Sequence, residues 1–440
     1  MTAPPARRKS VVIVTFSYWP VANARALRWT SLAEAWAQAG LAVCVVCAWQ
    51  KGRPAEETVN GVQIHRVGLA PIEKLRGLLA SQRTEPAVRG DEPPSGARAP
   101  GARILAAIVR LGRGLWREIY WPDTTCLWYL PARRKVSELV AAARPDALVS
   151  VSPTFTAVAV GYRALRRAAT RPRWLVDLGD PFSFLEEAPP NNPRLYRRLN
   201  YRFERSCLHA ADAVAVTNPA TRERYAELFP ESAGKLAVIP PLLSLSDLPA
   251  PSVADDRIRL VFLGTLYRSI RRPDFLLALL AALRAAPLGP RLELHIFGDA
   301  SECRSSIDRH APLLGRLLFL HGTVPRPRAL QALADASVLV NLGNVTSYQL
   351  PSKLVEYAAT GKPILNIAAS ASDSSTAFLA GYPKQLTLLA HGDRPSEDQV
   401  VRCERFLRDA GAPVDPAAQG WLTPFRLPAV SRQYLEALAL

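Results

Sequence analysis

The sequence predicts an α/β protein built from two doubly wound domains, each with a parallel sheet between layers of helices. Strands and helices alternate in two series, one on each side of the segment PPLLSLSDLPAPSVADD, which is rich in proline and has no periodicity. The strands are continuous apolar runs, which is typical of parallel sheets covered on both faces. A length of 440 residues also favours two domains over one.

The proline-rich segment sets the expected division of the chain. We expect an N-terminal domain over 1–240, a linker over 241–257, a second domain over 258–425 and a closing helix over 426–440. Residues 83–101 are rich in Pro and Gly with almost no apolar residues, so they predict a disordered insert in the first domain.

Each domain has its own series of elements. In the first, strands are expected at 11–16, 41–48, 62–67, 146–151, 174–177, 213–217 and 236–239, and helices at 24–39, 155–169, 194–210 and 219–229. In the second, strands are expected at 258–263, 292–297, 317–320, 337–342 and 363–367, and helices at 273–286, 326–335, 351–360 and 429–438. Ligands of such folds bind beyond the carboxyl ends of the strands, so the cleft between two such domains is the expected active site.

Composition excludes several classes of protein. Lys and Arg number 55 against 38 Asp and Glu, a net charge of +17, and 49% of residues are apolar, which excludes wholesale disorder. The apolar runs are too short to span a membrane. The N-terminal segment lacks the small-residue cleavage site of a signal peptide, so a cytoplasmic protein is expected. Cys44 and Cys47 form a CxxC inside an expected strand, and the six histidines show no ligand spacing. No metal site and no cofactor are expected.

The segment QLPSKLVEYAATGKPIL, residues 349–365, carries the first candidate site. Pro351 suits the first turn of a helix, with Ser352 and Lys353 at its amino end and Glu356 one turn further on. The free N–H groups of a helix start favour a phosphate, and Glu356 could accept hydrogen bonds from a ribose diol. The alternative is an ordinary capped helix.

A second phosphate-suited loop follows the first strand of the same domain. That strand ends at Gly264, and Arg268, Arg271 and Arg272 stand between it and the next helix. The forked guanidinium matches phosphate oxygens and stays charged near pH 7. A solvated basic loop is the alternative, but two such loops in one domain together favour a nucleotide diphosphate.

The C-terminal half resembles the donor-binding domain of glycosyltransferase family 4 enzymes, which have the GT-B fold. The similarity lies in a strand followed by G-x-L and a basic residue, in the strand end Ile296-Phe297-Gly298, and in PSKLVEYAATGKPIL. FSYWP, VNGVQIHRV, YWPDTTCLW, ARPDALVSVSP and WLVDLGDPFSF follow in family order in the N-terminal half. The resemblance implies two Rossmann-like domains that face each other across a cleft.

The resemblance also implies roles for particular residues. It places Gly264 and Arg271 near the donor diphosphate, Ser352 and Lys353 at the phosphate-binding helix start, and Glu356 on the ribose. Arg268, from the same loop, is kept as a further donor-binding candidate. Three positions depart from the family pattern. Tyr348 replaces the first Glu of a pair, which contacts the transferred sugar; VANAR replaces a double-glycine loop; and Ser152-Pro153-Thr154 stand where a His is often found.

Asp180, in DLGDPF after an expected strand, is the candidate catalytic residue. A carboxylate there could orient the acceptor hydroxyl or act as its base, although a loop Asp that caps a turn is equally common. Asp177, closer to the strand, is a weaker candidate. The family mechanism implied is transfer with retention of configuration, in which the leaving diphosphate helps to deprotonate the acceptor.

A basic, tryptophan-bearing segment suggests a membrane surface. Residues 103–135 hold seven basic and two acidic positions, an excess of +5, interleaved with tryptophans, and Arg194, Arg198 and Arg202 add a stripe beside Leu195 and Leu199. The alternative for that second stripe is an apolar face packed in the domain. No nucleic-acid-binding motif is present, so no nucleic acid partner is expected.

The resemblance and these residues together predict a bacterial glycosyltransferase of the hexosyltransferase type. Its expected donor is a nucleotide-diphosphate sugar and its acceptor a glycan or lipid-linked saccharide of cell-surface polysaccharide biosynthesis, at the inner face of the cell membrane. The alternatives are a sugar-nucleotide epimerase or hydrolase, which would turn over without an acceptor, and a non-catalytic binding subunit, which would bind no nucleotide.

Overall fold

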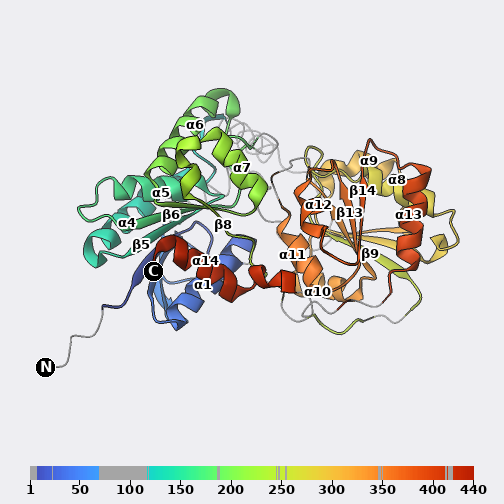
Figure 1. Ribbon diagram of the computed structural model, residues 1–440, viewed down its shortest axis with the longest axis horizontal. Helices are drawn as coiled ribbons and strands as arrows, with labels where there is room; N and C mark the ends of the chain where they lie inside the picture. Colours follow the sequence, from blue (N-terminus) through green and yellow to red (C-terminus); the bar gives the residue numbers. More distant parts are fainter. Residues whose placement is uncertain are drawn as a thin grey trace, which may run out of the picture. The chain divides into compact units, whose positions relative to one another are not determined.

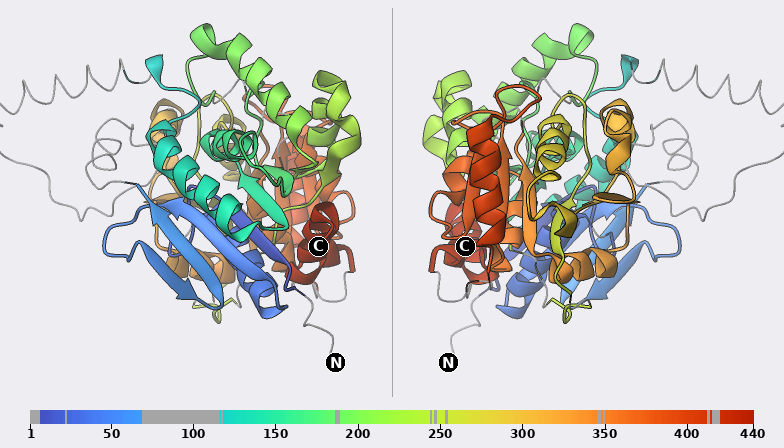
Figure 2. Two further views of the ribbon diagram at one scale, coloured as in Figure 1. Left: turned by 90° about the vertical axis from the view of Figure 1, so that its left-hand side faces the viewer. Right: turned by 90° about the vertical axis from the view of Figure 1, so that its right-hand side faces the viewer.

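The computed structural model divides the chain into two compact units, drawn in Figure 1 and Figure 2. It describes residues 7–440 apart from 22, 69–115, 117, 186–188, 244, 246–247, 253–254, 345–347, 349, 412–413 and 415–419. The first unit contains residues 1–217, 225–239 and 431–440, and the second contains 218–224 and 240–430. The insert expected at 83–101 lies outside the described residues.

The first unit is built on an eight-stranded sheet with the order β3-β4-β2-β1-β5-β6-β7-β8. All neighbours are parallel except β3 and β4, which form an antiparallel pair at the edge. The strands are β1 (Ser10–Val14), β2 (Ala42–Ala48), β3 (Glu56–Val59), β4 (Val62–Val67), β5 (Ala147–Val151), β6 (Arg173–Leu178), β7 (Ala213–Val216) and β8 (Leu236–Val238).

Helices cover this sheet and bury its apolar residues. They are α1 (Ala24–Gln38), α4 (Tyr129–Ala143), α5 (Phe155–Leu165), α6 (Pro193–Ala210) and the C-terminal part of α7 (Pro219–Leu228), whose first residues are grouped with the second unit. Val12 and Val14 of β1 join a core with Val136 of α4 and Val158 of α5, and α4 and α5 pack side by side. The side chain of Asn23 accepts a hydrogen bond from the Ala26 amide (2.8 Å), which fixes the start of α1.

The second unit has a six-stranded, wholly parallel sheet with the order β11-β10-β9-β12-β13-β14. Its strands are β9 (Ile258–Leu263), β10 (Leu292–Phe297), β11 (Leu318–Gly322), β12 (Val338–Leu342), β13 (Ile364–Ala368) and β14 (Gln385–Leu389). Its helices are α8 (Asp274–Leu283), α9 (Arg304–Asp308), α10 (Arg326–Asp335), α11 (Ser352–Ala359), α12 (Ser374–Leu379) and α13 (Glu397–Arg408).

Two cores lie on the two faces of this sheet. Leu260 of β9 packs in a core with residues of α8 and α13, whereas its neighbour Val261 packs in another with residues of α10, α11 and α12. Successive strand residues point to opposite faces, so both faces are covered by helices. This is the doubly wound arrangement that the continuous apolar strands predict.

The last helix, α14 (Leu427–Leu438), brings residues 431–440 into the first unit. The Trp36 indole donates a hydrogen bond to Ser431 Oγ (2.9 Å), and the buried Tyr434 ring packs 5.0 Å from Trp29 and 6.4 Å from Trp36. These aromatic contacts close the core beneath α1.

The expectations about membrane-spanning helices and about the Cys44–Cys47 pair can be compared with the structure. In the described part of the chain, no helix is both long and apolar enough to cross a bilayer. Cys44 and Cys47 lie in β2 as expected, and burial raises the pKa of each thiol to about 12, so both stay protonated.

Candidate functional site

The carboxyl edge of the second sheet is shaped by two glycines. Gly264 follows β9 with φ 156°, and Gly298 follows β10 with φ 143°. A Cβ at Gly298 would overlap the carbonyl oxygen of Gly264, and a Cβ at Gly264 would lie 3.4 Å from a guanidinium nitrogen of Arg271. The two backbones can approach each other only because Gly298 has no side chain, while the absence of a side chain at Gly264 leaves room for the Arg271 guanidinium.

Arg271 is held at this edge by a tight loop. Backbone hydrogen bonds join Tyr267 and Arg271 in both directions (2.9 and 3.2 Å), and the Arg271 guanidinium donates to Asn344 Oδ1 (2.8 Å). Burial lowers the pKa of Arg271. Its Nε is buried with no hydrogen-bond partner among the described residues, so a donor remains to be satisfied.

The other two arginines of this loop are placed differently. Arg272 is exposed and forms ion pairs with Asp274 (3.1 Å) and Asp393 (3.2 Å). Arg268 is exposed. Of the three arginines that the sequence offered for a diphosphate, Arg271 is the one that the loop turns toward Gly264.

The start of α11 adds a second cation. Pro351 occupies the N-cap and has no side-chain oxygen to cap the helix, which begins at Ser352. Lys353 is exposed, but partial desolvation of its ammonium by surrounding atoms, together with the positive charge of Arg271, lowers its pKa. Arg271 therefore lies beside Gly264, and Lys353 is close enough to Arg271 for their charges to repel, so a phosphate bound between the two cations would relieve that repulsion.

Glu356 lies one turn further along α11. Its carboxylate is 3.8 Å from the guanidinium of Arg326, at the start of α10. The neighbouring Tyr357 is fully buried and accepts a hydrogen bond from the Leu263 amide (2.8 Å). This bond ties the end of β9 to α11, so the two loops share one frame.

In the first unit, Asp177 has a structural role. Its buried carboxylate accepts hydrogen bonds from Arg25 (2.9 Å), the Trp29 indole (3.0 Å) and the Tyr434 hydroxyl (2.8 Å). These bonds join β6 to α1 and α14. Three donors account for the burial of this charge without a ligand.

Asp180 lies in the loop after β6, at the carboxyl edge of the first sheet, and is half-buried. The loop that follows Asp180 is held in place by hydrogen bonds to a side chain of α6. Glu204 of α6, which is fully buried, accepts hydrogen bonds from the Ser183 amide (3.0 Å), the Phe182 amide (3.4 Å) and the Tyr225 hydroxyl (2.8 Å). Sequence reasoning missed Glu204, because it stands among the arginines of α6 and its partners are distant in the chain.

Arg25 is a second residue that the sequence analysis did not single out. A Cβ at Gly179 would overlap its guanidinium, so Arg25 lies directly over the backbone beside Asp180. The sequence did contain a signal for Arg25. The segment VANAR, which stands where the family has a double-glycine loop, ends in this arginine. Its bond to Asp177 holds a cation beside the candidate carboxylate.

The anchoring role of Glu204 predicts a pH-dependent stability. Burial raises the pKa of Glu204 above its ordinary value of 4.5, so the folded chain binds this proton more tightly than the unfolded chain. The resulting stabilisation is present below pH 4.5 and is lost as the pH rises through the raised pKa. We therefore expect the free energy of unfolding of Glu204→Gln to increase relative to that of wild type as the pH rises, because wild type loses this stabilisation and the amide does not titrate.

Chemical denaturation at a series of pH values measures this difference. Glu223→Gln, on an exposed position of α7, controls for the introduction of an amide. A difference between Glu204→Gln and wild type that stays constant with pH would show that Glu204 keeps the same protonation state in both forms of the chain.

Family comparisons agree with this architecture. The family model for a glycosyl transferase 4-like domain matches residues 25–241, and the model for glycosyl transferases group 1 matches residues 257–394. No curated protein matches the sequence.

Several solved structures are similar over almost the whole chain. Sucrose-phosphate synthase from Thermosynechococcus elongatus has 14% identity and a TM-score of 0.64, with 98% of each chain covered. The E. coli trehalose-6-phosphate protein bound with UDP-2-fluoro glucose has 11% identity and a TM-score of 0.63, with 98% of this chain and 99% of the other covered. WaaG, a glycosyltransferase involved in lipopolysaccharide biosynthesis, has 13% identity and a TM-score of 0.56, with 97% and 98% covered.

At these identities the structures show a shared fold, and the two family models supply the enzyme class. Both models match consecutive parts of the chain, one in each sheet-bearing unit. The chain is a family 4-like glycosyltransferase with the two Rossmann-like domains of the GT-B fold.

Proposed function

We propose that this enzyme transfers a sugar from a nucleotide-diphosphate sugar to a glycan or lipid-linked acceptor, with retention of configuration, in cell-surface polysaccharide biosynthesis. The observation that carries the donor class is the buried guanidinium of Arg271 beside Gly264, with Lys353 close enough for the two charges to interact. The positive charges of Arg271 and Lys353, together with the buried Nε–H of Arg271 that has no hydrogen-bond partner among the described residues, suit the oxygens of a diphosphate. The UDP-sugar in the E. coli structure and the lipopolysaccharide role of WaaG support the donor and the pathway.

In the proposed reaction, Arg271, Lys353 and the amides at the start of α11 hold the diphosphate, and Glu356 accepts hydrogen bonds from the ribose hydroxyls. The bond from the anomeric carbon to the diphosphate oxygen breaks, and a bond from that carbon to the acceptor oxygen forms. The acceptor proton passes to Asp180 or to the leaving diphosphate, which takes up the electron pair of the broken bond.

The donor site is tested by calorimetric titration with UDP, GDP, ADP and TDP. Wild type should bind at least one of them, and Glu356→Ala should bind it about ten-fold or more weakly, because a hydrogen bond to a charged group contributes roughly 1.5–3 kcal/mol. Glu397→Ala, at an exposed position of α13, is the matched control. Unchanged affinity in Glu356→Ala would remove this residue from the site.

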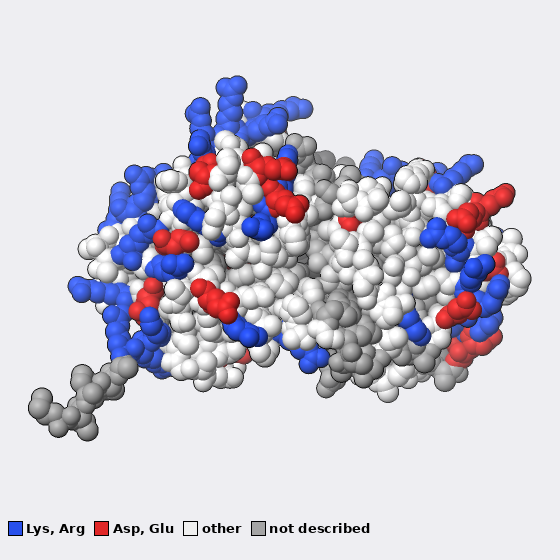
Figure 3. All heavy atoms as spheres, viewed as in Figure 1, with Lys and Arg blue, Asp and Glu red and all other residues white. Residues whose placement is uncertain are grey.

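We also propose that the enzyme docks on anionic membrane through the outer face of α6. Leu195 and Leu199 are 62% and 44% exposed, and Ile119, whose carbonyl accepts a hydrogen bond from Tyr196, is 51% exposed. Figure 3 shows Lys and Arg side chains gathered over the part of the first unit that carries α6. Exposed leucines among arginines suit an anionic bilayer surface. Residues 103–115 of the basic segment lie outside the described residues.

Sedimentation with vesicles tests this docking. Binding to vesicles that contain phosphatidylglycerol should exceed binding to phosphatidylcholine alone, and should weaken with salt because exposed charges are screened over roughly 8–10 Å near physiological ionic strength. Leu195→Asp/Leu199→Asp should abolish it, whereas Val401→Asp, on an equally exposed apolar residue of α13, should not. Equal binding to neutral and anionic vesicles would contradict the proposal.

A further inference from the structure

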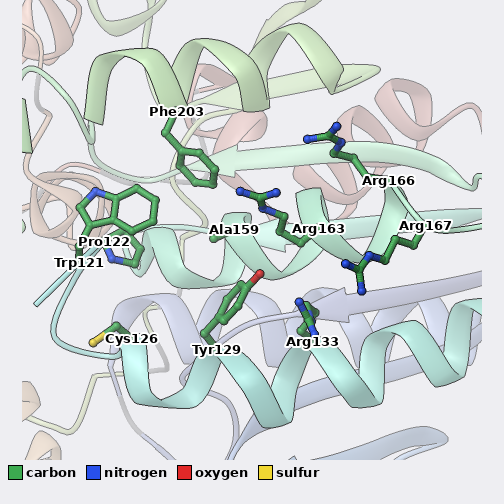
Figure 4. Close-up of a pocket in the computed structure, with 10 residues that line it drawn as sticks. All are labelled: Trp121, Pro122, Cys126, Tyr129, Arg133, Ala159, Arg163, Arg166, Arg167 and Phe203. Carbon is green, nitrogen blue, oxygen red and sulfur yellow. The ribbon is translucent and has the colours of Figure 1, made fainter. Parts of the chain in front are cut away.

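A hollow with a volume of about 600 Å³ opens among the helices of the first unit (Figure 4). Its walls come from α4, α5, α6 and the segment before α4. The lining residues are Trp121, Pro122, Cys126, Tyr129, Arg133, Ala159, Arg163, Arg166, Arg167 and Phe203. The volume lies within the roughly 300–1,000 Å³ that is usual for small-molecule sites. We call this hollow the arginine groove.

One side of the arginine groove is strongly cationic. Four lining residues are arginines and none is acidic. Among the residues that the structure describes, none of the four guanidinium groups has a carboxylate within ion-pair distance. Three of them lie near aromatic rings: Arg133 is 5.7 Å from the ring of Tyr129, and Arg163 and Arg166 are 5.8 and 5.7 Å from the ring of Tyr162. An anion in the groove would relieve the repulsion between these charges.

The other side of the groove is aromatic and fixed. Trp121 and Phe203 pack edge to face with their ring centroids 4.9 Å apart, and the Trp121 indole donates to Asn200 Oδ1 (2.9 Å). Figure 4 shows these rings beside Tyr129 at one end and the guanidinium groups toward the other. Burial raises the pKa of the nearby Cys126 thiol to about 11, in keeping with an apolar end.

We propose that the arginine groove binds a phosphorylated ligand, with its phosphate or diphosphate on the guanidinium groups and an apolar body against Trp121 and Phe203. A phosphate monoester carries about −1.5 to −2 charges at pH 7 and offers three acceptor oxygens, so it can accept from several arginines at once. A carboxylate has two oxygens and one charge, and would leave most of these donors unused. The site is separate from the proposed donor residues, which all lie in the second unit.

Calorimetry with octyl phosphate below its micelle concentration tests the proposal. Wild type should bind octyl phosphate more tightly than inorganic phosphate, because the octyl group of the ligand packs against the rings of Trp121 and Phe203. Arg163→Gln/Arg167→Gln should weaken octyl phosphate binding at least about ten-fold, since hydrogen bonds to charged groups contribute roughly 1.5–3 kcal/mol each. These arginines are exposed, so the fold should be retained, as thermal unfolding would check.

Two controls locate the binding. Arg134→Gln/Arg144→Gln removes the same charge from exposed positions at α4 that do not line the groove, and should leave affinity nearly unchanged. Lys353→Ala, in the proposed donor site, should leave it unchanged as well. Trp121→Ala should weaken octyl phosphate binding while sparing inorganic phosphate.

Three results would overturn the proposal: no binding of octyl phosphate, equal loss in the groove variant and the Arg134/Arg144 control, or loss in Lys353→Ala instead. Vesicles of phosphatidylcholine with phosphatidic acid then distinguish the source of the phosphate. If the groove variant loses vesicle binding, the ligand is a lipid headgroup. If it loses only octyl phosphate, the ligand is a free phosphorylated molecule. Both results support the groove as a phosphate site.

Discussion

Asp180→Asn is expected to lower the rate of sugar transfer by about 10²- to 10⁴-fold, the usual cost of losing a positioned general base, while affinity for the nucleoside diphosphate stays near the wild-type value. The amide has the same volume as the carboxylate, so the loop held by Glu204 should keep its shape. It cannot accept a proton at neutral pH. The measurement pairs a transfer assay with a binding titration on one preparation.

Asp212→Asn is the matched control, because Asp212 is a carboxylate of the same unit that pairs with the exposed Arg171. It should leave the transfer rate unchanged. Full activity in Asp180→Asn would show that this carboxylate is not the base, and would assign proton uptake to the leaving diphosphate.

Arg271→Ala is expected to weaken binding of the nucleoside diphosphate by about ten-fold or more, with little change in affinity for the corresponding nucleoside. The reason is geometric: the guanidinium lies beside Gly264 and near Lys353, where the phosphates are proposed to bind, and is held by Asn344. Titration of the same variant with both ligands separates a phosphate contact from a contact with the base or ribose.

Arg268→Ala and Arg272→Ala are the comparisons for this result. Arg272 is paired with two carboxylates and Arg268 is exposed, so both variants should bind nearly as well as wild type. If Arg268→Ala shows the selective loss instead, the pocket is retained with a different arginine. Equal losses for the diphosphate and the nucleoside would contradict a phosphate role for Arg271.

Apolar runs made much of the fold predictable. Strands β9 and β10 have the expected bounds, because IRLVFL and LELHIF are flanked by polar or glycine residues that end them. The edge strand β3 was missed because EETV has no apolar run; Glu56 pairs with His65 and Lys135 instead of entering the core. Helix α13 had a readable signal: Ser396 and Gln399 form a capping box in which each side chain bonds the other's backbone amide.

The candidate site was less predictable, because its contacts join distant parts of the chain. By residue type alone the three arginines of the loop are equivalent, and a contact with Asn344, 73 positions away, distinguishes Arg271 from its neighbours in the structure. In the same way, Asp177 resembles Asp180 in the sequence, but its bond to Tyr434, 257 positions away, gives it a structural role. A local motif can name the type of residue, but only the packed fold shows which copy of it is used in a structural contact.

The packing of residues 431–440 onto the first unit has a consequence for synthesis on the ribosome. About 190 residues separate the end of the first unit's main segment at Ile239 from Ser431. At about 5–20 residues per second, this stretch takes roughly 10–40 s to translate. Throughout that time Trp29, Trp36 and Asp177 lack Tyr434, so the first half of the nascent chain waits with an incomplete core until the second half has emerged. Folding of the first unit is therefore expected to be completed only after the residues of the second unit have been synthesised.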